Sequence, residues 1–594
     1  MRAKLEDHFR RLEFDASGQS ALSQHRRSLE ALGPHLSEMK SNRSCLSCSM
    51  FMPVKVFQCG HAICDVCVRR FGSSTPTAKH SFTLTCCVLC GCEQPKDCRV
   101  FQLTPPIAGI RALCIDGGGV RGVIPLMFLQ HLEDELSGLG GTISECFDYV
   151  CGTSAGGLIA MGVFLMRWSP SECLRRFEEL ATTTFKLNEG NETLTWSQKL
   201  QRLFRVCLRD HHYNLSPIEK AFQAQSDSTT KMFNPLQTDT KVAVTTTSVR
   251  ENVAGVISNY NYGPRLDATT YHHIRAAQPQ HDMTITCTSA APFFFKSKDV
   301  VQLDTFQDGG LRHNNPAWLA VWECETIWPE RCHVFGVESS GVRLDHFISL
   351  GTGTNAPSTY QLDPHSPKLD RFFKRLRNSF EHHLNNEEQW NTFVRCVPTK
   401  LRSRCLCLNV PLPGGAPALD DVTAMTQLKT AASKSVERNA AVARARDTLF
   451  ASLFYLEADA YNRMEDGTYK CSSTIYCRLA LGFEERKRFY RTLLRKHAMF
   501  VVSSRAHPCV SSLPSGFPMY RRSMDLRLKS RKDDVHVYLS GVTSEPTPIS
   551  RMPTQLDWLI EAQSLESPFR TIDSRCVEKQ LPSTPLKRKV TFKV

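Results

Sequence analysis

The chain of 594 residues lacks an uninterrupted apolar run long enough for a membrane-spanning helix, which needs about 20 apolar residues. No apolar run of signal-peptide length follows the charged first residues, Met1 to Asp7. No internal repeat is evident either. These absences predict a cytoplasmic chain with neither a signal peptide nor a transmembrane segment.

Recognisable nucleic-acid-binding motifs are also missing, although the chain is basic. It has 73 Lys and Arg residues against 59 Asp and Glu residues, which gives a formal net charge of +14. A positive charge of this size favours approach to an anionic membrane surface through long-range attraction. We therefore expect peripheral association with a membrane, and we do not expect nucleic acid as a partner.

Cysteine, by contrast, is abundant, with 25 residues in a chain for which no secretory signal is expected. Such usage indicates reduced thiols and metal ligands rather than disulfides. One region carries ligands in the pattern Cys-x2-Cys, Cys-x-His-x2-Cys-x2-Cys and Cys-x2-Cys, enough for two tetrahedral zinc ions with a structural role. The eight candidate ligands are Cys45, Cys48, Cys59, His61, Cys64, Cys67, Cys87 and Cys90.

This order of ligands resembles the RING finger, a double-zinc module. The resemblance implies that one ion takes the first and third pairs of ligands and the other ion takes the second and fourth pairs. Cys86 or Cys92 could replace a member of the last pair. RING fingers commonly recruit ubiquitin-conjugating enzymes, but the last knuckle here contains Val88 and Leu89 instead of a proline, and Gly91 stands where active members often carry a cation. Ubiquitin ligation, docking of a protein partner and a purely structural role all remain open.

The clearest sign of catalysis is Gly152-Thr153-Ser154-Ala155-Gly156. It lies between a predicted strand ending at Cys151 and a helix predicted from Ala155 to about Met166. Gly152 and Gly156 permit the sharp turn on which a nucleophilic serine projects from a sheet. Because short glycine-serine turns also occur by chance, this motif needs support from its neighbours.

A glycine-rich loop follows the strand predicted over residues 111–115 and leads into a helix that begins near Val123. Several backbone N–H groups at such a helix start can bind an oxyanion or a phosphate. The pattern also fits the G-x-G-x-x-G of dinucleotide sites, but the next strand closes on Cys151 instead of the acidic residue that such sites require. We favour the oxyanion interpretation, with the loop residues Gly117, Gly118, Gly119, Val120, Arg121 and Gly122.

A third motif, Asp308-Gly309-Gly310, precedes an apolar helix predicted over residues 317–327. The three motifs, in this order, resemble the patatin-like phospholipase family over about residues 107 to 360. The resemblance implies release of fatty acids from phospholipids, lysophospholipids or neutral glycerolipids. It implies Ser154 as nucleophile, Asp308 as its base, and the amides of Gly118, Gly119 and Val120 as oxyanion donors. Calcium would not be needed, because backbone amides hold the oxyanion.

Predicted strands and helices alternate through this region, which favours an α/β sandwich with a mainly parallel central sheet. Further strands are expected at 241–247, 253–259 and 333–337, and a helical cap at 169–223. The alternative to a Ser-Asp dyad is a Ser-Asp-His triad. It would recruit His313, His346 or the pair His382-His383; His313 is better explained as a turn residue and the pair as surface residues.

The remaining chain divides by composition. We expect amphipathic helices at 1–40, the RING-like module at 41–100, the hydrolase domain at 107–360, a polar linker or helix at 361–400, an accessory α+β region at 401–504 and a largely flexible basic tail at 505–594. The accessory region should contain one long helix at 419–456 and strands at 468–481.

Two functions therefore stay in view. The first is a lipid acyl hydrolase that carries an appended zinc module. The second is a RING-led interaction protein, or a ubiquitin-ligase-like protein, whose patatin-like domain only binds lipid. The intact serine, aspartate and glycine loop favour the first, because a domain that only binds would not need all three.

Overall fold

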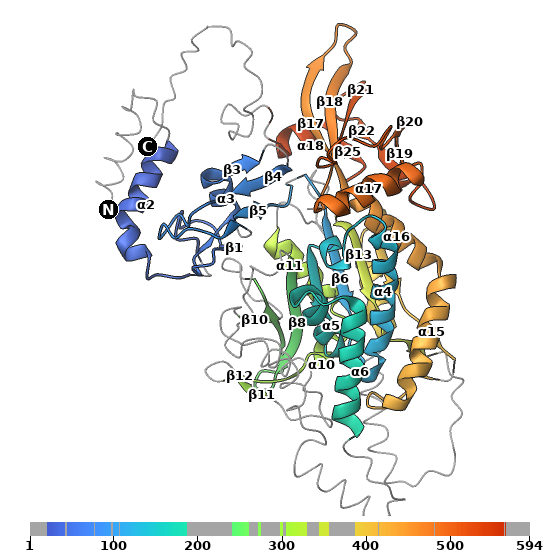
Figure 1. Ribbon diagram of the computed structural model, residues 1–594. Coiled ribbons are helices and arrows are strands. Elements are labelled where there is room, and N and C mark those ends of the chain that lie inside the picture. Colours follow the sequence, from blue (N-terminus) through green and yellow to red (C-terminus); the bar gives the residue numbers. More distant parts are fainter. Residues whose placement is uncertain are drawn as a thin grey trace, which may run out of the picture.

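The computed structural model describes residues 21–41, 44–75, 78–96, 99–105, 107–186, 240–260, 271–274, 298–300, 304–328, 344–355, 386–413, 415–479, 481–563 and 565. Figure 1 shows three parts: a small cysteine-rich part in blue, a central layered part, and a β-rich part in orange and red. Among the described residues, no helix is both long and apolar enough to cross a membrane.

The central part is built on a nine-stranded sheet. Its path runs β10-β9-β8-β7-β6-β13-β15, and β12 pairs with both β8 and β11. The neighbours from β8 to β15 are parallel, whereas β9 and β12 run antiparallel to β8. The strands are β6 (Ile110–Ile115), β7 (Tyr149–Gly152), β8 (Lys241–Ser248), β9 (Ala254–Ser258), β10 (Tyr271–Ile274), β11 (Lys298–Val300), β12 (Asp304–Asp308), β13 (Leu344–Leu350) and β15 (Cys405–Leu408).

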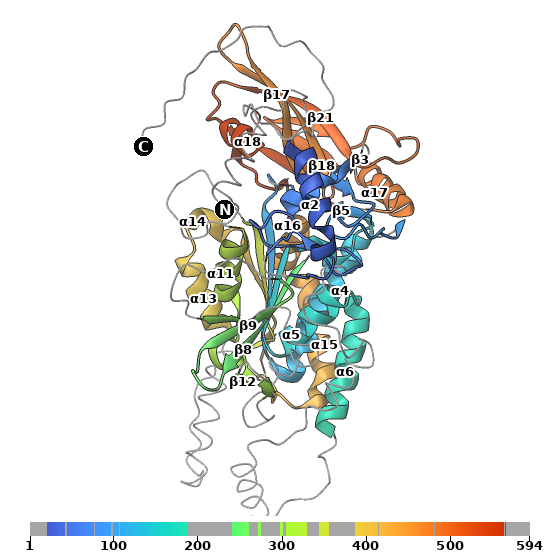
Figure 2. The same ribbon diagram turned by 90° about the vertical axis from the view of Figure 1, so that its left-hand side faces the viewer.

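Helices cover both faces of this sheet (Figure 2). Successive residues of β6 alternate between two apolar cores, with Leu113 in one and Ala112 in the other, as the two-residue period of a strand requires. This arrangement confirms the predicted α/β sandwich with a mainly parallel sheet. The first face carries α4 (Val123–Ser137), α5 (Ala155–Ile159), its π-helical continuation (Ala160–Leu165), α6 (Pro170–Lys186), α15 (Met425–Arg438) and α16 (Ala440–Ser452); the second carries α11 (Ala317–Ile327) and α13 (Asn386–Cys396).

The sheet extends beyond the domain boundary expected at residue 360. β15 pairs in parallel with β13, and α15 packs against α4. The long helix expected at 419–456 is instead two helices, because the chain turns at Asn439, whose side chain accepts a hydrogen bond from the Ala441 amide at 2.9 Å. This is an N-cap. An alanine-rich composition favours helix locally but does not reveal such a break.

The β-rich part corrects the flexible tail expected from residue 505, because it is folded as far as residue 563. In β21, the buried residues Met524 and Leu526 alternate with the exposed residues Ser523, Asp525 and Arg527. The charged and polar composition therefore did not reveal a half-buried strand. The expected stretch at 566–594 lies outside the described residues. The elements are β17 (Phe454–Arg463), β18 (Tyr469–Cys477), α17 (Phe483–Arg495), β19 (Met499–Val502), β20 (Arg505–Pro508), β21 (Arg521–Leu528), β22 (Asp534–Val535), β23 (Val537–Ser540), β24 (Thr547–Pro548), β25 (Thr554–Gln555) and α18 (Leu556–Ala562).

The cysteine-rich part has its own small apolar core, which includes Leu29, Phe57 and Phe82. One helix covers part of the amphipathic stretch expected at 1–40, of which residues 1–20 lie outside the described chain. The elements are α2 (Ala21–Leu36), β1 (Lys55–Val56), β2 (Ala62–Ile63), α3 (Asp65–Phe71), β3 (Ser73–Thr75), β4 (Ala78–Thr83) and β5 (Val100–Gln102).

A buried pair joins this part to the β-rich part. His80 Nε2 lies 2.6 Å from Glu457 Oε1, and both side chains are buried. Arg69 contacts the other ring nitrogen of His80 at 3.4 Å. Since arginine can only donate, that nitrogen accepts, and His80 donates its Nε2–H to Glu457.

A second buried network joins the β-rich part to the sheet. Arg478 contacts Asp345 at 2.7 Å and Asp148 at 3.2 Å, and its side chain is 5% exposed. Arg111 contacts Asp148 at 2.9 Å, and Ser550 donates to Asp345 at 2.7 Å. Removing one member of such a network leaves a buried charge without its partner.

We therefore expect Arg478→Met to lower the free energy of unfolding by about 3–5 kcal/mol. Urea denaturation measures the change. Arg488→Met is the matched control, because Arg488 lies on the surface and its ion pair with Glu485, at 3.5 Å, is exposed. Exposed ion pairs contribute about 0–1 kcal/mol to the free energy of unfolding. Equal losses in the two variants would show that the buried network does not hold the parts together.

Candidate active site and cysteine clusters

Ser154 lies on a tight turn directly after β7. Its φ is 52° and its ψ is −120°, a conformation that L-residues rarely adopt and that neighbouring structure must enforce. A Cβ on Gly152 would overlap the Gly156 carbonyl oxygen, and a Cβ on Gly156 would overlap the Ile115 carbonyl oxygen. Only glycine fits at these two positions, which explains the spacing around the serine.

Asp308 ends β12 and lies against β8, far from Ser154 in sequence. Its side chain is 4% exposed. The Gly310 amide donates to Oδ1 at 2.6 Å, and the carboxyl is also hydrogen-bonded to the Ser154 side chain. Burial raises the pKa of Asp308 to about 6, against these two hydrogen bonds, which lower it. The arrangement thus pairs a strained serine with a carboxylate that is more basic than usual.

The glycine-rich loop runs beside this pair into a short 3-10 turn, Gly119–Gly122. The amide of Gly117 donates to the Asn314 carbonyl at 3.1 Å, and that of Val120 donates to the Leu419 carbonyl at 2.8 Å. The sequence predicts the Val120 amide as an oxyanion donor. This prediction is not met in the structure, because the amide is already bonded to the Leu419 carbonyl. Leu419 comes from the connection after β15, which the sequence did not link to the loop.

The amides of Gly118 and Gly119 have no hydrogen-bond acceptor within the described part of the chain. The same holds for Ala155, the first residue of α5, which sequence reasoning missed. A helix start leaves such amides unpaired, so they can serve an anion. Arg121 Nε donates to the Gly118 carbonyl at 3.3 Å.

Three further side chains meet at the Gly117 carbonyl oxygen. Thr352 Oγ1 donates to it at 2.9 Å, Asn386 Nδ2 at 3.4 Å and Asn314 Nδ2 at 3.5 Å. The two asparagines and the threonine belong to three separate segments. An isolated asparagine or threonine has no pattern that marks it in sequence, although Asn314 does follow the third motif closely.

The described contacts of the candidate histidines do not include Ser154 or Asp308. The His313 ring lies edge-on to Trp322, and its backbone carbonyl accepts the Thr153 hydroxyl at 2.8 Å. His346 lies opposite Arg111 in the strand register of β13 and β6, at the amino end of these strands, whereas Ser154 follows the carboxyl end of β7. Burial lowers the pKa of His346 well below its ordinary value. His382 and His383 lie outside the described residues.

The eight predicted metal ligands gather into two groups of four, with the ligand atoms of each group within 4.8 Å of one another. One group is Cys45, Cys48, Cys64 and Cys67; the other is Cys59, His61, Cys87 and Cys90. This is the division that the RING resemblance implies, and Cys86 and Cys92 are exposed and belong to neither group.

The donor set fits a tetrahedral ion. The sulfurs of Cys45 and Cys67, of Cys48 and Cys64, and of Cys59 and Cys90 are each 3.7 Å apart, and Zn–S bonds of 2.3 Å in a tetrahedron would give about 3.8 Å. His61 Nε2 donates to the Leu36 carbonyl at 3.1 Å, which leaves Nδ1 as the ligand atom. The cysteine-rich part therefore fits a small metal-binding module.

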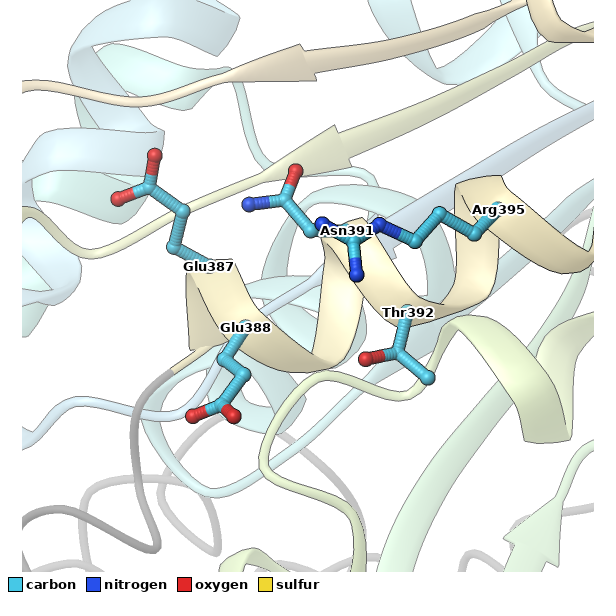
Figure 3. A pocket seen from close by; sticks show the side chains of 5 residues that line it. All are labelled: Glu387, Glu388, Asn391, Thr392 and Arg395. Atoms are coloured by element: carbon cyan, nitrogen blue, oxygen red, sulfur yellow. The ribbon is translucent and has the colours of Figure 1, made fainter.

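A separate hollow of about 420 Å³ lies on the outer side of α13 (Figure 3). It is lined by Glu387, Glu388, Asn391, Thr392 and Arg395. The residues of the same helix that meet the glycine loop and its surroundings are Asn386 and Gln389, which accepts the Asn315 amide at 3.0 Å. The hollow is thus no part of the site around Ser154.

Residues 113–321 match the family model described as patatin-like phospholipase. The matched segment contains Ser154, Asp308 and the whole glycine-rich loop. Together with the central sheet, the match identifies this part of the chain as a patatin-like domain.

The chain is similar to curated proteins over part of its length. Calcium-independent phospholipase A2-gamma of Homo sapiens is 29% identical over 343 residues, which cover 56% of this chain and 38% of the relative. Phospholipase A I of Arabidopsis thaliana is 26% identical over 291 residues, which cover 42% of this chain and 21% of the relative. The chain therefore spans well under half the length of these relatives. VipD from Legionella pneumophila, a solved structure, aligns with a TM-score of 0.23 and 10% identity over 67% of this chain and 72% of VipD, a likeness too weak to carry a conclusion.

The raised pKa of Asp308 has a consequence for stability. A carboxyl whose folded pKa of about 6 exceeds its ordinary value of 3.8 makes its full contribution to stability below about pH 4 and loses it as the pH rises through about 6. Asp308→Asn removes the buried charge and keeps an oxygen that can accept from Gly310. We expect this variant to be up to about 3 kcal/mol more stable than the parent at pH 8 and equal to it at pH 4.

Thermal unfolding of both proteins across this pH range measures the effect. Asp525→Asn is the control, because Asp525 is exposed and its contacts with Lys470 and Ser472 lower its pKa, so that variant should gain nothing at pH 8. A destabilised Asp308→Asn at pH 8 would contradict the raised pKa.

Proposed function

We propose that this chain is a lipid acyl hydrolase, of phospholipase A or lysophospholipase type, that releases fatty acids from glycerolipids through Ser154 and Asp308. The observation that carries the proposal is the hydrogen-bonded pair itself: a serine on a strained turn against a buried carboxyl with a pKa of about 6. The patatin-like match and the phospholipase names of the relatives support it.

In the first step Ser154 Oγ forms a bond to the ester carbonyl carbon and gives its proton to Asp308. The carbonyl electron pair moves to oxygen, which becomes the oxyanion. The carbon–oxygen ester bond then breaks, and Asp308 returns the proton to the leaving alcohol. Water attacks the acyl-serine in the same way, with Asp308 as base, to release the fatty acid. A carboxylate is a weak base for an alcohol, because its pKa is far below that of the hydroxyl. The raised pKa of Asp308 makes the difference between the two pKa values smaller.

The amides of Gly118 and Gly119, with that of Ala155, are the donors best suited to the oxyanion, since the Val120 amide is bound to Leu419. Preorganised amides can stabilise the developing charge without reorganisation during the reaction. Because they supply this stabilisation, we propose that catalysis needs no calcium. The name of the human relative, calcium-independent phospholipase A2-gamma, agrees with that.

The positive net charge of +14 supports a phospholipid surface as the place of action, reached from the cytoplasm by peripheral association. For the cysteine-rich part we propose two structural zinc ions, on the fit of its two ligand groups. A second candidate function is that this RING-like module docks a protein partner or acts in ubiquitin transfer while the patatin-like domain only binds lipid; the fit of the ligand groups supports the zinc module that this function would need.

The catalytic proposal predicts that the parent releases fatty acid from vesicles of mixed phospholipid and lysophospholipid, in EDTA as in calcium. Ser154→Ala and Asp308→Asn should lower kcat by at least about 10⁴-fold, because each removes a member of the reacting pair. His313→Ala should leave kcat nearly unchanged. Mass spectrometry of the released acids measures the rate and identifies the preferred lipid.

Folded parent protein that releases nothing from any lipid would refute the hydrolase proposal and leave the RING-led function. A large loss in His313→Ala would instead favour the triad mechanism.

The zinc proposal predicts two zinc ions per chain, measured by elemental analysis of the purified protein. Cys87→Ser should lose one ion, because it removes a ligand of the second group. Its neighbour Cys86, exposed and in neither group, offers a matched control, and Cys86→Ser should keep both ions. A strong chelator should unfold the module, since structural zinc contributes about 10 kcal/mol or more to folding. Full zinc content in Cys87→Ser would contradict the assignment.

A further inference from the structure

We propose that Thr352, Asn314 and Asn386 form a carbonyl clamp on Gly117 that aims the amide of Gly118 at the oxyanion. These three side chains would be positioning residues for the reaction, two of them outside the segment that matches the patatin-like family model. The inference rests on the proposed hydrolase function and adds to it the residues that set the direction of an oxyanion donor.

The clamp acts on a single peptide group. Its three side-chain donors lie 2.9, 3.4 and 3.5 Å from the Gly117 carbonyl oxygen. In a trans peptide the carbonyl of one residue and the N–H of the next point in opposite directions. Fixing the Gly117 carbonyl therefore fixes the direction of the Gly118 N–H, which has no acceptor among the described residues.

The clamp also acts on the strength of that amide. Hydrogen bonds to a carbonyl polarise its peptide group, so the N–H on the other side becomes a better donor. One partner would be enough to satisfy a buried carbonyl, which has only two lone pairs. Three donors gathered on one oxygen exceed what burial alone requires.

The clamp is rigid because its members are buried and tied to one another. Thr352 is 1% exposed, and a Cβ on Gly118 would overlap it, so loop and clamp touch without a gap. Asn314 donates to the Asn386 side-chain oxygen. The neighbouring Asn315 donates to Asp116 at 2.9 Å, at the start of the same loop. A change in one member therefore reaches the loop directly.

A clamp that aims an oxyanion donor affects the transition state and not the bound substrate. Removing a direct oxyanion donor lowers kcat by about 10²–10³-fold. For Thr352→Val, which keeps the shape and removes the hydroxyl, we expect about a ten-fold loss in kcat with KM nearly unchanged. Thr352→Ser should restore most of the rate, because it returns the donor.

The matched control is Thr543→Val. Thr543 is also buried and donates to a backbone carbonyl, that of Leu539, at 2.9 Å, but it lies in the β-rich part. This variant should lose similar thermal stability and keep its kcat. Asn386→Leu provides a second test at the clamp if Thr352→Val folds poorly, with the same loss in kcat expected.

A trifluoromethyl ketone lipid analogue gives an independent readout, because its adduct with serine carries an oxyanion. Its affinity should fall in Thr352→Val by the same factor as kcat/KM. An active parent whose kcat is unchanged in Thr352→Val and Asn386→Leu, or a loss confined to KM, would overturn the clamp alone. A folded parent without hydrolase activity would overturn the proposed function and the clamp with it.

Discussion

Ser154 can stand beside the glycine-rich loop because no side chain separates its turn from the end of β6. The Thr153 amide donates to the Ile115 carbonyl at 3.1 Å, and a Cβ on Gly156 would overlap the same oxygen. This contact between backbones holds the serine at positive φ, a strain that only a crowded surrounding can maintain. The hydrogen bond between Ser154 and Asp308 depends on it.

The sequence predicts the parts of the site whose chemistry lies within a few consecutive residues. The turn at Ser154, the glycine loop and the aspartate before two glycines each have a local steric or electrostatic requirement that restricts the residue types. The alternation of buried strands and helices likewise predicts the layered fold, because burial on both faces produces continuous apolar strands. The two groups of cysteine and histidine ligands are predictable for the same reason, since a metal knuckle needs fixed spacing.

The rest depends on contacts between distant segments, which leave no local pattern. Thr352 and Asn386 are single polar residues, and nothing around them in sequence points to the Gly117 carbonyl. The Leu419 carbonyl takes the Val120 amide, and no property of the loop itself could have indicated that. The folded region after residue 505 was missed because most of its strands have only two to four residues, and the longer β21 carries charged residues on its exposed face. Composition alone therefore predicted a flexible tail, whereas the burial of apolar side chains in the folded protein orders this region.

Several residues that contact the glycine-rich loop lie outside the segment that matches the family model. Ser154 and Asp308, the proposed nucleophile and base, fall inside the segment that matches the family model, whereas Thr352, Asn386 and Leu419 fall after its last residue, 321. A fragment cut at the limits of that match would thus keep Ser154, Asp308 and Asn314, and it would lose the contacts that Thr352, Asn386 and Leu419 make with the glycine-rich loop. The partners of the glycine-rich loop thus extend beyond the matched segment, to the connection after β15 and to the start of α13.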